Sequence, residues 1–150
     1  MSQSLSDILI HVVFSTKERR PMIRPEIEEE LYRYISALCR DAKSPVIRIG
    51  GVADHLHILL SLARTISASD LIVSIKANSS RWIKTKGEFY RIFSWQNGYG
   101  AFSVSQSMRA RVVNYIAQQK EHHQKISFKE EFLMMLQKAN IEFDERFLWD

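Results

Sequence analysis

Two apolar runs, Pro45–Val52 and His55–Leu62, follow each other with almost no chain between them. Both are rich in β-branched and aliphatic residues, as half-buried or buried strands are. Gly50, Gly51 and Asp54 supply turn-forming residues at the junction. The pattern predicts an antiparallel hairpin, so the fold of this chain must be built around antiparallel strands.

The other expected elements fit around this hairpin. Pro25 and the acidic residues after it are typical of a helix start, and Ser67 or Ser69 can cap a second helix. Short strands are expected on either side of a turn at Asn97-Gly98. The expected elements are a first strand over 6–15, helices over 25–42 and 68–85, short strands over 90–95 and 101–104, and helices over 106–124 and 128–139. The order β-α-β-β-α-β predicts a ferredoxin-like α+β fold, an antiparallel sheet with helices on one face and an appended C-terminal helix.

The 150 residues, 45% hydrophobic and 25% charged, are typical of one globular domain spanning residues 1–150. The single Cys39 excludes an internal disulfide and fits a reducing compartment. Neither a signal peptide nor an apolar run of the ~20 residues that span a membrane is present, so we expect a cytoplasmic protein without a membrane partner. A net charge of +4 permits a nucleic-acid partner without requiring one.

The triplet His55-Leu56-His57 lies in the second strand of the predicted hairpin. Alternation along a strand places both imidazoles on one face and Leu56 on the other. Two such imidazoles can share a divalent metal ion if another residue completes the ligand set. The alternative is a pair of structural histidines, one of them buried and hydrogen-bonded.

Tyr115 and Gln119 are four residues apart in the predicted helix over 106–124, so both project from the same side. If that side lies over the two histidines, Gln119 becomes a third metal ligand and Tyr115 points at a phosphate bound to the metal. A phenol is a poor nucleophile near neutral pH, but a metal ion that polarises a phosphodiester favours its attack. Tyr115 is therefore a candidate nucleophile, with a core tyrosine as the alternative.

Four further polar residues have less certain assignments. His122 and His123 are expected at a solvated or phosphate-contacting helix end rather than as metal ligands. His11 lies in the first strand and is interpreted as a buried, hydrogen-bonded histidine, with a DNA contact as the alternative. Asp54 is either a turn residue or an acceptor that orients an imidazole.

Basic residues cluster in the loop after the first strand, where Lys17, Arg19 and Arg20 are well suited to phosphate contacts. Arg81, in the second helix, could hydrogen-bond a nucleic-acid backbone, although a solvated polar helix face explains it equally well. These four residues are the candidate DNA-binding residues.

Several of these motifs occur together in a known family. The His-hydrophobe-His strand, the Tyr-x-x-x-Gln helix and the stretch from Trp95 to Ser105 resemble the single-tyrosine HUH transposases of small bacterial insertion sequences. The segments 11–17 (HVVFSTK) and 50–57 (GGVADHLH) are also similar to that family. The resemblance covers about residues 8–130, and the motifs occur in matching order.

The resemblance implies cleavage and rejoining of hairpin-bearing single-stranded DNA through a 5′-phosphotyrosine. It implies Mg²⁺ or Mn²⁺ as the cofactor, held by His55 and His57 with Gln119 as third ligand, and Tyr115 as the nucleophile. It also implies a homodimer in which the tyrosine helix can complete the partner's site. The alternative is a non-catalytic nucleic-acid-binding module, such as a domesticated transposase relative or an RNA binder with the same fold.

Overall fold

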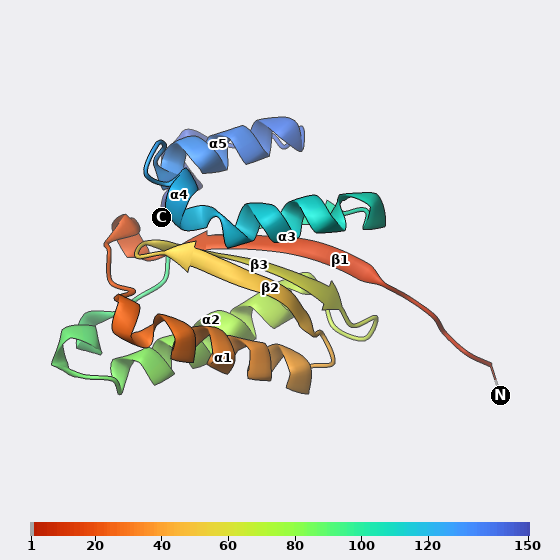
Figure 1. Cartoon of the computed structure of the whole chain (residues 1–150), viewed down its shortest axis with the longest axis horizontal. Helices are drawn as coiled ribbons and strands as arrows, with labels where there is room; N and C mark the ends of the chain where they lie inside the picture. The colour runs from red at the N-terminus through yellow and green to blue at the C-terminus, as the bar shows by residue number, and fades with distance from the viewer. Residues whose placement is uncertain (1) are drawn as a thin grey trace.

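The computed structural model describes residues 2–150, with a four-stranded antiparallel sheet at its centre (Figure 1). The strand order in the sheet is β2-β3-β1-β4. The strands are β1 (Ile8–Ser15), β2 (Val46–Val52), β3 (His55–Leu62) and β4 (Gly100–Val104). With the helices between them, this order confirms the predicted ferredoxin-like α+β arrangement.

The predicted hairpin is β2–β3, and its turn is short. Val52 pairs with His55, so only Ala53 and Asp54 connect the two strands. On the other side of β3, β1 runs antiparallel with Val13 opposite His57. Because paired residues in an antiparallel ladder share a face, this register fixes which side chains surround the histidines.

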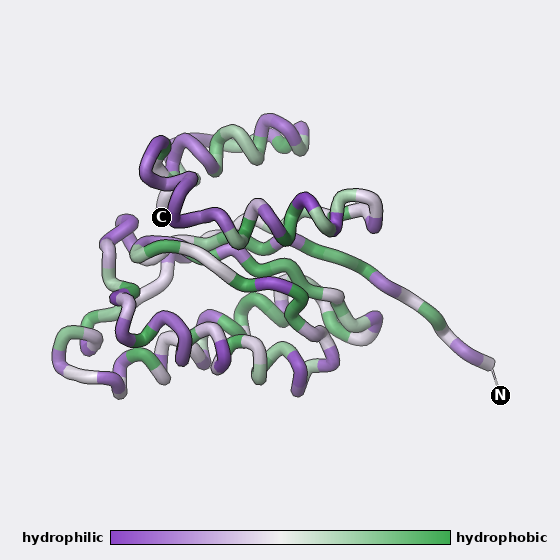
Figure 2. The backbone as a smooth tube through the Cα atoms, in the orientation of Figure 1, coloured by the Kyte–Doolittle hydropathy of each residue, from purple (hydrophilic) through white to green (hydrophobic). Residues whose placement is uncertain are grey.

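Helices α1 (Pro25–Asp41) and α2 (Ala68–Lys84) cover one face of the sheet, seen below it in Figure 1. Ser67 caps α2 by accepting a hydrogen bond from the backbone N–H of Asp70 at 3.0 Å. Alternate residues of β1 and β3 point into this layer, and Figure 2 shows the strands as the most hydrophobic part of the chain. The main core consists mainly of Ile10, Val12, Phe14, Leu56, Ile58 and Leu60 from the sheet, Ile27, Leu31, Ile35 and Cys39 from α1, and Leu71, Ile72, Ile75 and Ile83 from α2.

Three helices lie on the opposite face of the sheet: α3 (Arg109–Ala117), α4 (Gln119–His122) and α5 (Phe128–Lys138) (Figure 1). Two smaller clusters hold them there. Ile116 packs with Leu9 and Leu59, and three residues of α5 pack with Val13 (Phe128, Phe132 and Leu136). The helices on the second face therefore pack on residues of both β1 and β3.

The structure corrects two predicted elements. Residues 90–95 were expected to form a strand, but Glu88–Ile92 form the 3-10 helix η2, and Trp95 makes only an isolated bridge to Thr16. The expected continuous helix over 106–124 begins as the 3-10 helix η3 (Gln106–Met108) and is interrupted at Gln118. The aromatic side chains Tyr90, Phe93 and Trp95 are buried in the main core outside any regular strand, which explains why their composition resembles that of a strand.

The remaining short elements are the 3-10 helix η1 (Lys17–Arg19) after β1 and the helical turn α6 (Glu145–Leu148) near the C-terminus. None of the helices in residues 2–150 combines the length and the apolar character that a bilayer crossing requires.

Candidate active site

The two histidines of β3 lie side by side on the face covered by α3, α4 and α5, and both are fully buried. Each has its Nδ1 engaged by a neighbour. His55 Nδ1 lies 2.7 Å from Asp54 Oδ1, and His57 Nδ1 lies 2.8 Å from His11 Nε2. Asp54 is thus both a turn residue and an acceptor that orients an imidazole, and His11 is a buried hydrogen-bonded histidine as expected. These contacts leave both Nε2 atoms facing the helices.

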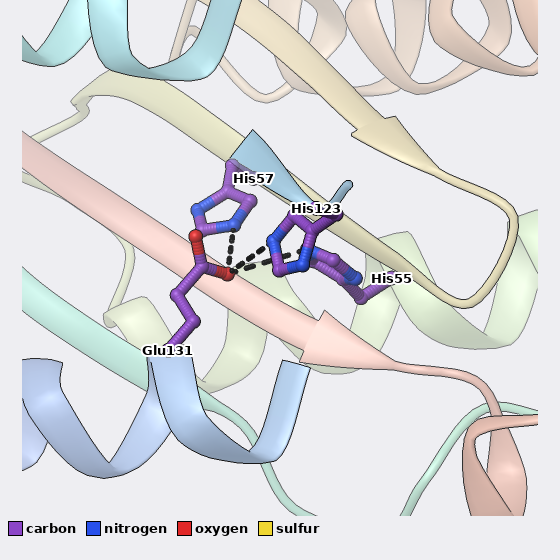
Figure 3. A group of neighbouring side chains, drawn as sticks. All are labelled: His55, His57, His123 and Glu131. Atoms are coloured by element: carbon purple, nitrogen blue, oxygen red, sulfur yellow. Dashed lines mark hydrogen bonds and ion pairs between the residues drawn. The ribbon is translucent and has the colours of Figure 1, made fainter. Parts of the chain in front are cut away.

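Glu131 of α5 occupies the point on which the histidines converge (Figure 3). Its Oε1 lies 3.3 Å from His55 Nε2, 2.9 Å from His57 Nε2 and 3.0 Å from His123 Nε2. The Nδ1 of His123 donates to the carbonyl of Ile126 at 2.9 Å, so its Nε2 is also free to face Glu131. A Ser127–Glu130 capping box starts α5 and so fixes the position of Glu131 one residue further on.

Tyr115 and Gln119 lie against the other carboxylate oxygen. The Tyr115 hydroxyl donates a hydrogen bond to Glu131 Oε2, and Gln119 Nε2 donates to the same oxygen at 3.2 Å. Gln119 Oε1 is 3.1 Å from His55 Nε2. The side-chain oxygen expected to be a ligand and the candidate nucleophile therefore both reach the histidine pair, despite the break in the helix between them.

The surroundings of the titratable groups in the site shift their pKa values in different directions. Burial, reinforced by neighbouring His55 and His123, lowers the pKa of His57 to about 4, even though Glu131 opposes the shift. Burial also acts on His55, but hydrogen bonds to Asp54 and Glu131 outweigh it and raise its pKa to about 9. Burial and the bond to Glu131 raise the pKa of Tyr115. Burial opposes ionisation of Glu131, but its bonds to the histidines hold the pKa well below its usual range.

These donors fit a divalent metal ion. The Nε2 atoms of His55, His57 and His123 and a carboxylate oxygen of Glu131 all lie within 4.8 Å of one another. His123 Nε2 is buried without a well-aligned hydrogen-bond partner, as expected for a nitrogen with its lone pair available. Three imidazole nitrogens and one carboxylate, each oriented by a second contact, are a typical ligand set for a first-row transition metal.

Comparison with known proteins defines the family. The family model described as "Transposase IS200 like" matches residues 4–119, more than half of the chain. The chain belongs to the IS200-like transposase family. The matched segment of this transposase contains β1 to β4, the two β3 histidines, Tyr115 and Gln119, and ends before His123 and Glu131.

Individual relatives agree with this assignment. The ISDra2 transposase TnpA of Deinococcus radiodurans is 24% identical over 114 residues, which cover 73% of this chain and 81% of the relative. A crystal structure described as a transposase from D. radiodurans R1 has a TM-score of 0.62 at 20% identity, covering 79% of this chain and 98% of the other. A REP-associated tyrosine transposase bound to a REP hairpin has a TM-score of 0.63 at 16% identity, covering 84% of this chain and 76% of the other. The two structures share the fold of this transposase.

The structure separates the four basic residues predicted to bind DNA. Lys17, Arg19 and Arg20 lie in or beside η1, next to the β2–β3 turn, because Thr16 N–H bonds the carbonyl of Asp54 at 2.8 Å. Arg19 donates to the carbonyl of Trp149 at 3.2 Å, and Arg20 pairs with Glu18 at 2.9 Å. Arg81 bonds Asn78 on α2, which lies on the opposite face of the sheet from α3 (Figure 1). Only the η1 group lies at the end of the sheet that carries His55.

Two residues of the site were not found from the sequence. Glu131 was absent from the prediction, although it shares a helix face with Phe128 and Met135, where an acid needs a partner. His123 was expected at a solvated helix end. That expectation is wrong, since its side chain is 8% exposed and its Nε2 faces Glu131. The chain turns at Gln118 and again before Ser127, and these turns fold both residues over β3.

Proposed function

We propose that this transposase cuts and rejoins hairpin-bearing single-stranded DNA through a covalent bond to Tyr115. One observation carries the proposal: the Tyr115 hydroxyl bonds the same carboxylate on which three histidine Nε2 atoms converge. A nucleophile beside a metal-ligand cluster is the arrangement that phosphodiester transfer requires.

In the proposed cleavage, Tyr115 Oη forms a bond to phosphorus while the bond from phosphorus to the 3′-oxygen breaks. The phenolic proton is lost, and the departing oxygen takes up a proton to become a free 3′-hydroxyl. The product is a 5′-phosphotyrosine, and attack of a 3′-hydroxyl on it reverses the reaction and rejoins the strand. Glu131 orients the phenol by accepting its hydrogen bond, and Gln119 donates a second hydrogen bond to the same carboxylate oxygen.

The metal ligands proposed here are His55 and His57, joined by Gln119 as the sequence predicted and by His123 and Glu131 as the geometry adds. A divalent ion held there would polarise the scissile phosphate and neutralise charge that develops on its oxygens. Of Mg²⁺ and Mn²⁺, we favour Mn²⁺, because Mg²⁺ strongly prefers oxygen ligands and this set is rich in imidazole.

The DNA partner and the homodimer are also part of the proposal. The fold neighbour bound to a REP hairpin supports a hairpin substrate, and the η1 group Lys17, Arg19 and Arg20 would contact phosphates near the histidines. Tyr115 meets the histidines of its own chain, so one chain supplies every residue proposed for one site. A homodimer that shares its tyrosine helices would need α3 to exchange between protomers.

The deciding experiment is a denaturing gel of the protein incubated with labelled hairpin-bearing single-stranded DNA and Mn²⁺. We expect a covalent protein–DNA band that EDTA abolishes and that Tyr115→Phe lacks while retaining DNA affinity. Tyr34→Phe is the matched control, because the Tyr34 ring of α1 stacks on Trp82 of α2, on the other face of the sheet, and it should form the band normally.

An adduct of normal yield in Tyr115→Phe would refute the nucleophile. Tight metal-independent binding to RNA, with no adduct on any hairpin in a varied pool, would instead support the non-catalytic nucleic-acid-binding module.

A further inference from the structure

A cavity of about 250 Å³ opens beside Tyr115, between α5 and the segment that contains α4. It shares Tyr115 and Glu131 with the site of the converging histidines, whereas His55, His57 and His123 are not among the residues that line it. Its walls come from Tyr115, His122, Ile126 and one face of α5. It is the place from which a substrate can reach the phenol without displacing the sheet.

The α5 face that lines the cavity has an unusual composition. Glu131, Met134, Met135 and Lys138 follow the i, i+3, i+4, i+7 spacing of one helix face. Met134 is 52% exposed, although the neighbouring positions Phe132 and Leu136 are buried. A polarisable, flexible thioether wall with one end open to solvent suits a flat apolar group that enters from outside.

Two basic side chains of the cavity suit an anion, because the Glu131 carboxylate that also lines it is already paired with histidines. His122 Nε2 is 3.4 Å from the Tyr115 hydroxyl and 3.3 Å from Glu131 Oε2, so this ring stands beside the nucleophile. Lys138 forms no ion pair within residues 2–150, and its ammonium is available at the cavity edge. A phosphate placed between them would lie next to the phenol oxygen.

We propose that this cavity binds the single unpaired nucleotide beside the scissile phosphate, an inference that rests on the proposed function of the same site. The base packs against Met134, Met135 and Ile126, and His122 and Lys138 bind the phosphate. The wall offers thioether and aliphatic groups rather than amides or hydroxyls that read a base edge, so the pocket accepts different bases. Sequence selectivity must then come from the hairpin.

Cross-linking tests the position of this nucleotide. The probe is a DNA hairpin with oligothymidylate arms that carry 4-thiothymidine, irradiated with the Tyr115→Phe protein so that cleavage cannot intervene. We expect the cross-linked peptide to come from residues 126–138. A cross-link confined to other segments would overturn the proposal.

A matched pair of lysine variants tests the phosphate contact. Lys138→Ala should bind the same hairpin about fivefold more weakly and lower the salt slope of binding by about one. Lys125→Ala removes an equal charge from a nearby exposed position outside the cavity and should leave both quantities close to the parent values. Equal effects of the two substitutions would refute the role of Lys138.

These measurements separate the inference from the proposed function. If the parent protein forms no adduct but the cross-link maps to residues 126–138, the cavity binds a nucleotide and the cleavage proposal fails. If the parent protein forms adducts and the cross-link maps elsewhere, the cleavage proposal stands and the cavity assignment fails.

Discussion

Glu131 shows how one side chain can organise a site from distant parts of a chain. Its two oxygens contact histidines of β3, the residue after α4, and the tyrosine of α3. Its side chain is only 2% exposed, and a buried carboxylate is tolerated only when charged or hydrogen-bonding partners surround it. The same contacts that keep Glu131 ionised also fix the direction of the Tyr115 hydroxyl.

Away from the site, Lys76 of α2 likewise connects distant parts of the chain, because it binds the loop that precedes β4. Its ammonium donates to the backbone carbonyls of Gln96, Asn97 and Gly98 at 2.6, 3.2 and 2.9 Å. Burial lowers its pKa from 10.5 to about 8. Between these pH values the unfolded chain holds the extra proton, so the contribution of Lys76 to stability rises with pH.

Lys76→Met tests this linkage. We expect the unfolding free energy of the parent, relative to that of Lys76→Met, to be constant below pH 8 and to increase as the pH rises from about 8 to 10.5. Urea denaturation across this range measures it, with Lys84→Met, at the exposed end of the same helix, as control. A difference that is independent of pH, or that falls as pH rises, would contradict the assigned burial.

At the residue scale, the sequence predicts the groups that lie on regular elements. Alternation along a strand predicts that His55 and His57 lie on one face of the sheet and Leu56 on the other, and the structure confirms this. Glu131 could not be placed, because its position depends on where α5 returns over the sheet. Periodicity within one element carries no information about that return.

At the scale of elements, the approach of α3 to β2 decides whether Tyr115 reaches the histidines. Gly50 lies under α3, and a Cβ added there would meet the carbonyl oxygen of Ile116 at 2.7 Å. That oxygen belongs to the helix backbone, so the whole helix would have to shift. A residue without a side chain is therefore needed at this point of β2.

Gly50→Ala should lower stability by about 2 kcal/mol and reduce the yield of the Tyr115 adduct, because overpacking pushes α3 away from the sheet. Gly98→Ala is the matched control, since its nearest atom is the Gln96 amide nitrogen at 3.8 Å. Thermal unfolding and the denaturing gel measure the two effects. Full adduct yield in Gly50→Ala would show that the tyrosine helix does not depend on this contact.

The elements also show where sequence patterns fail. The hairpin, α1 and α2 were predicted within a few residues because turn residues, caps and apolar spacing agree in each of them. The sequence of Tyr90–Trp95 predicts a strand because buried aromatic residues occur in strands and in packed 3-10 turns alike, but Glu88–Ile92 form a 3-10 helix. The break at Gln118 has no glycine or proline to mark it, so local preferences could not reveal it.

At the scale of the whole molecule, a metal ion would join the sheet to the helices that cover its second face. His55 and His57 belong to β3, His123 follows α4, and Glu131 belongs to α5. The sheet with α1 and α2 has a large core of its own, whereas α5 packs through a much smaller cluster. Metal bound by these four residues would therefore stabilise the attachment of α5 more than any other part of the fold.

Mn²⁺ at about 100 times its dissociation constant should add about 2.7 kcal/mol to stability, which corresponds to a Tm increase of roughly 5–10 °C. Mg²⁺ should raise Tm less, because imidazole nitrogen is a poor ligand for it. Thermal unfolding with each ion, with and without EDTA, measures the shift, and His57→Ala should abolish it. Hydrogen exchange should show the largest Mn²⁺-dependent protection in α5. The control variant is His122→Ala, which leaves the four converging ligands intact and should keep most of the Tm shift with Mn²⁺. Equal Tm shifts with and without His57 would place the ion elsewhere and refute the ligand set.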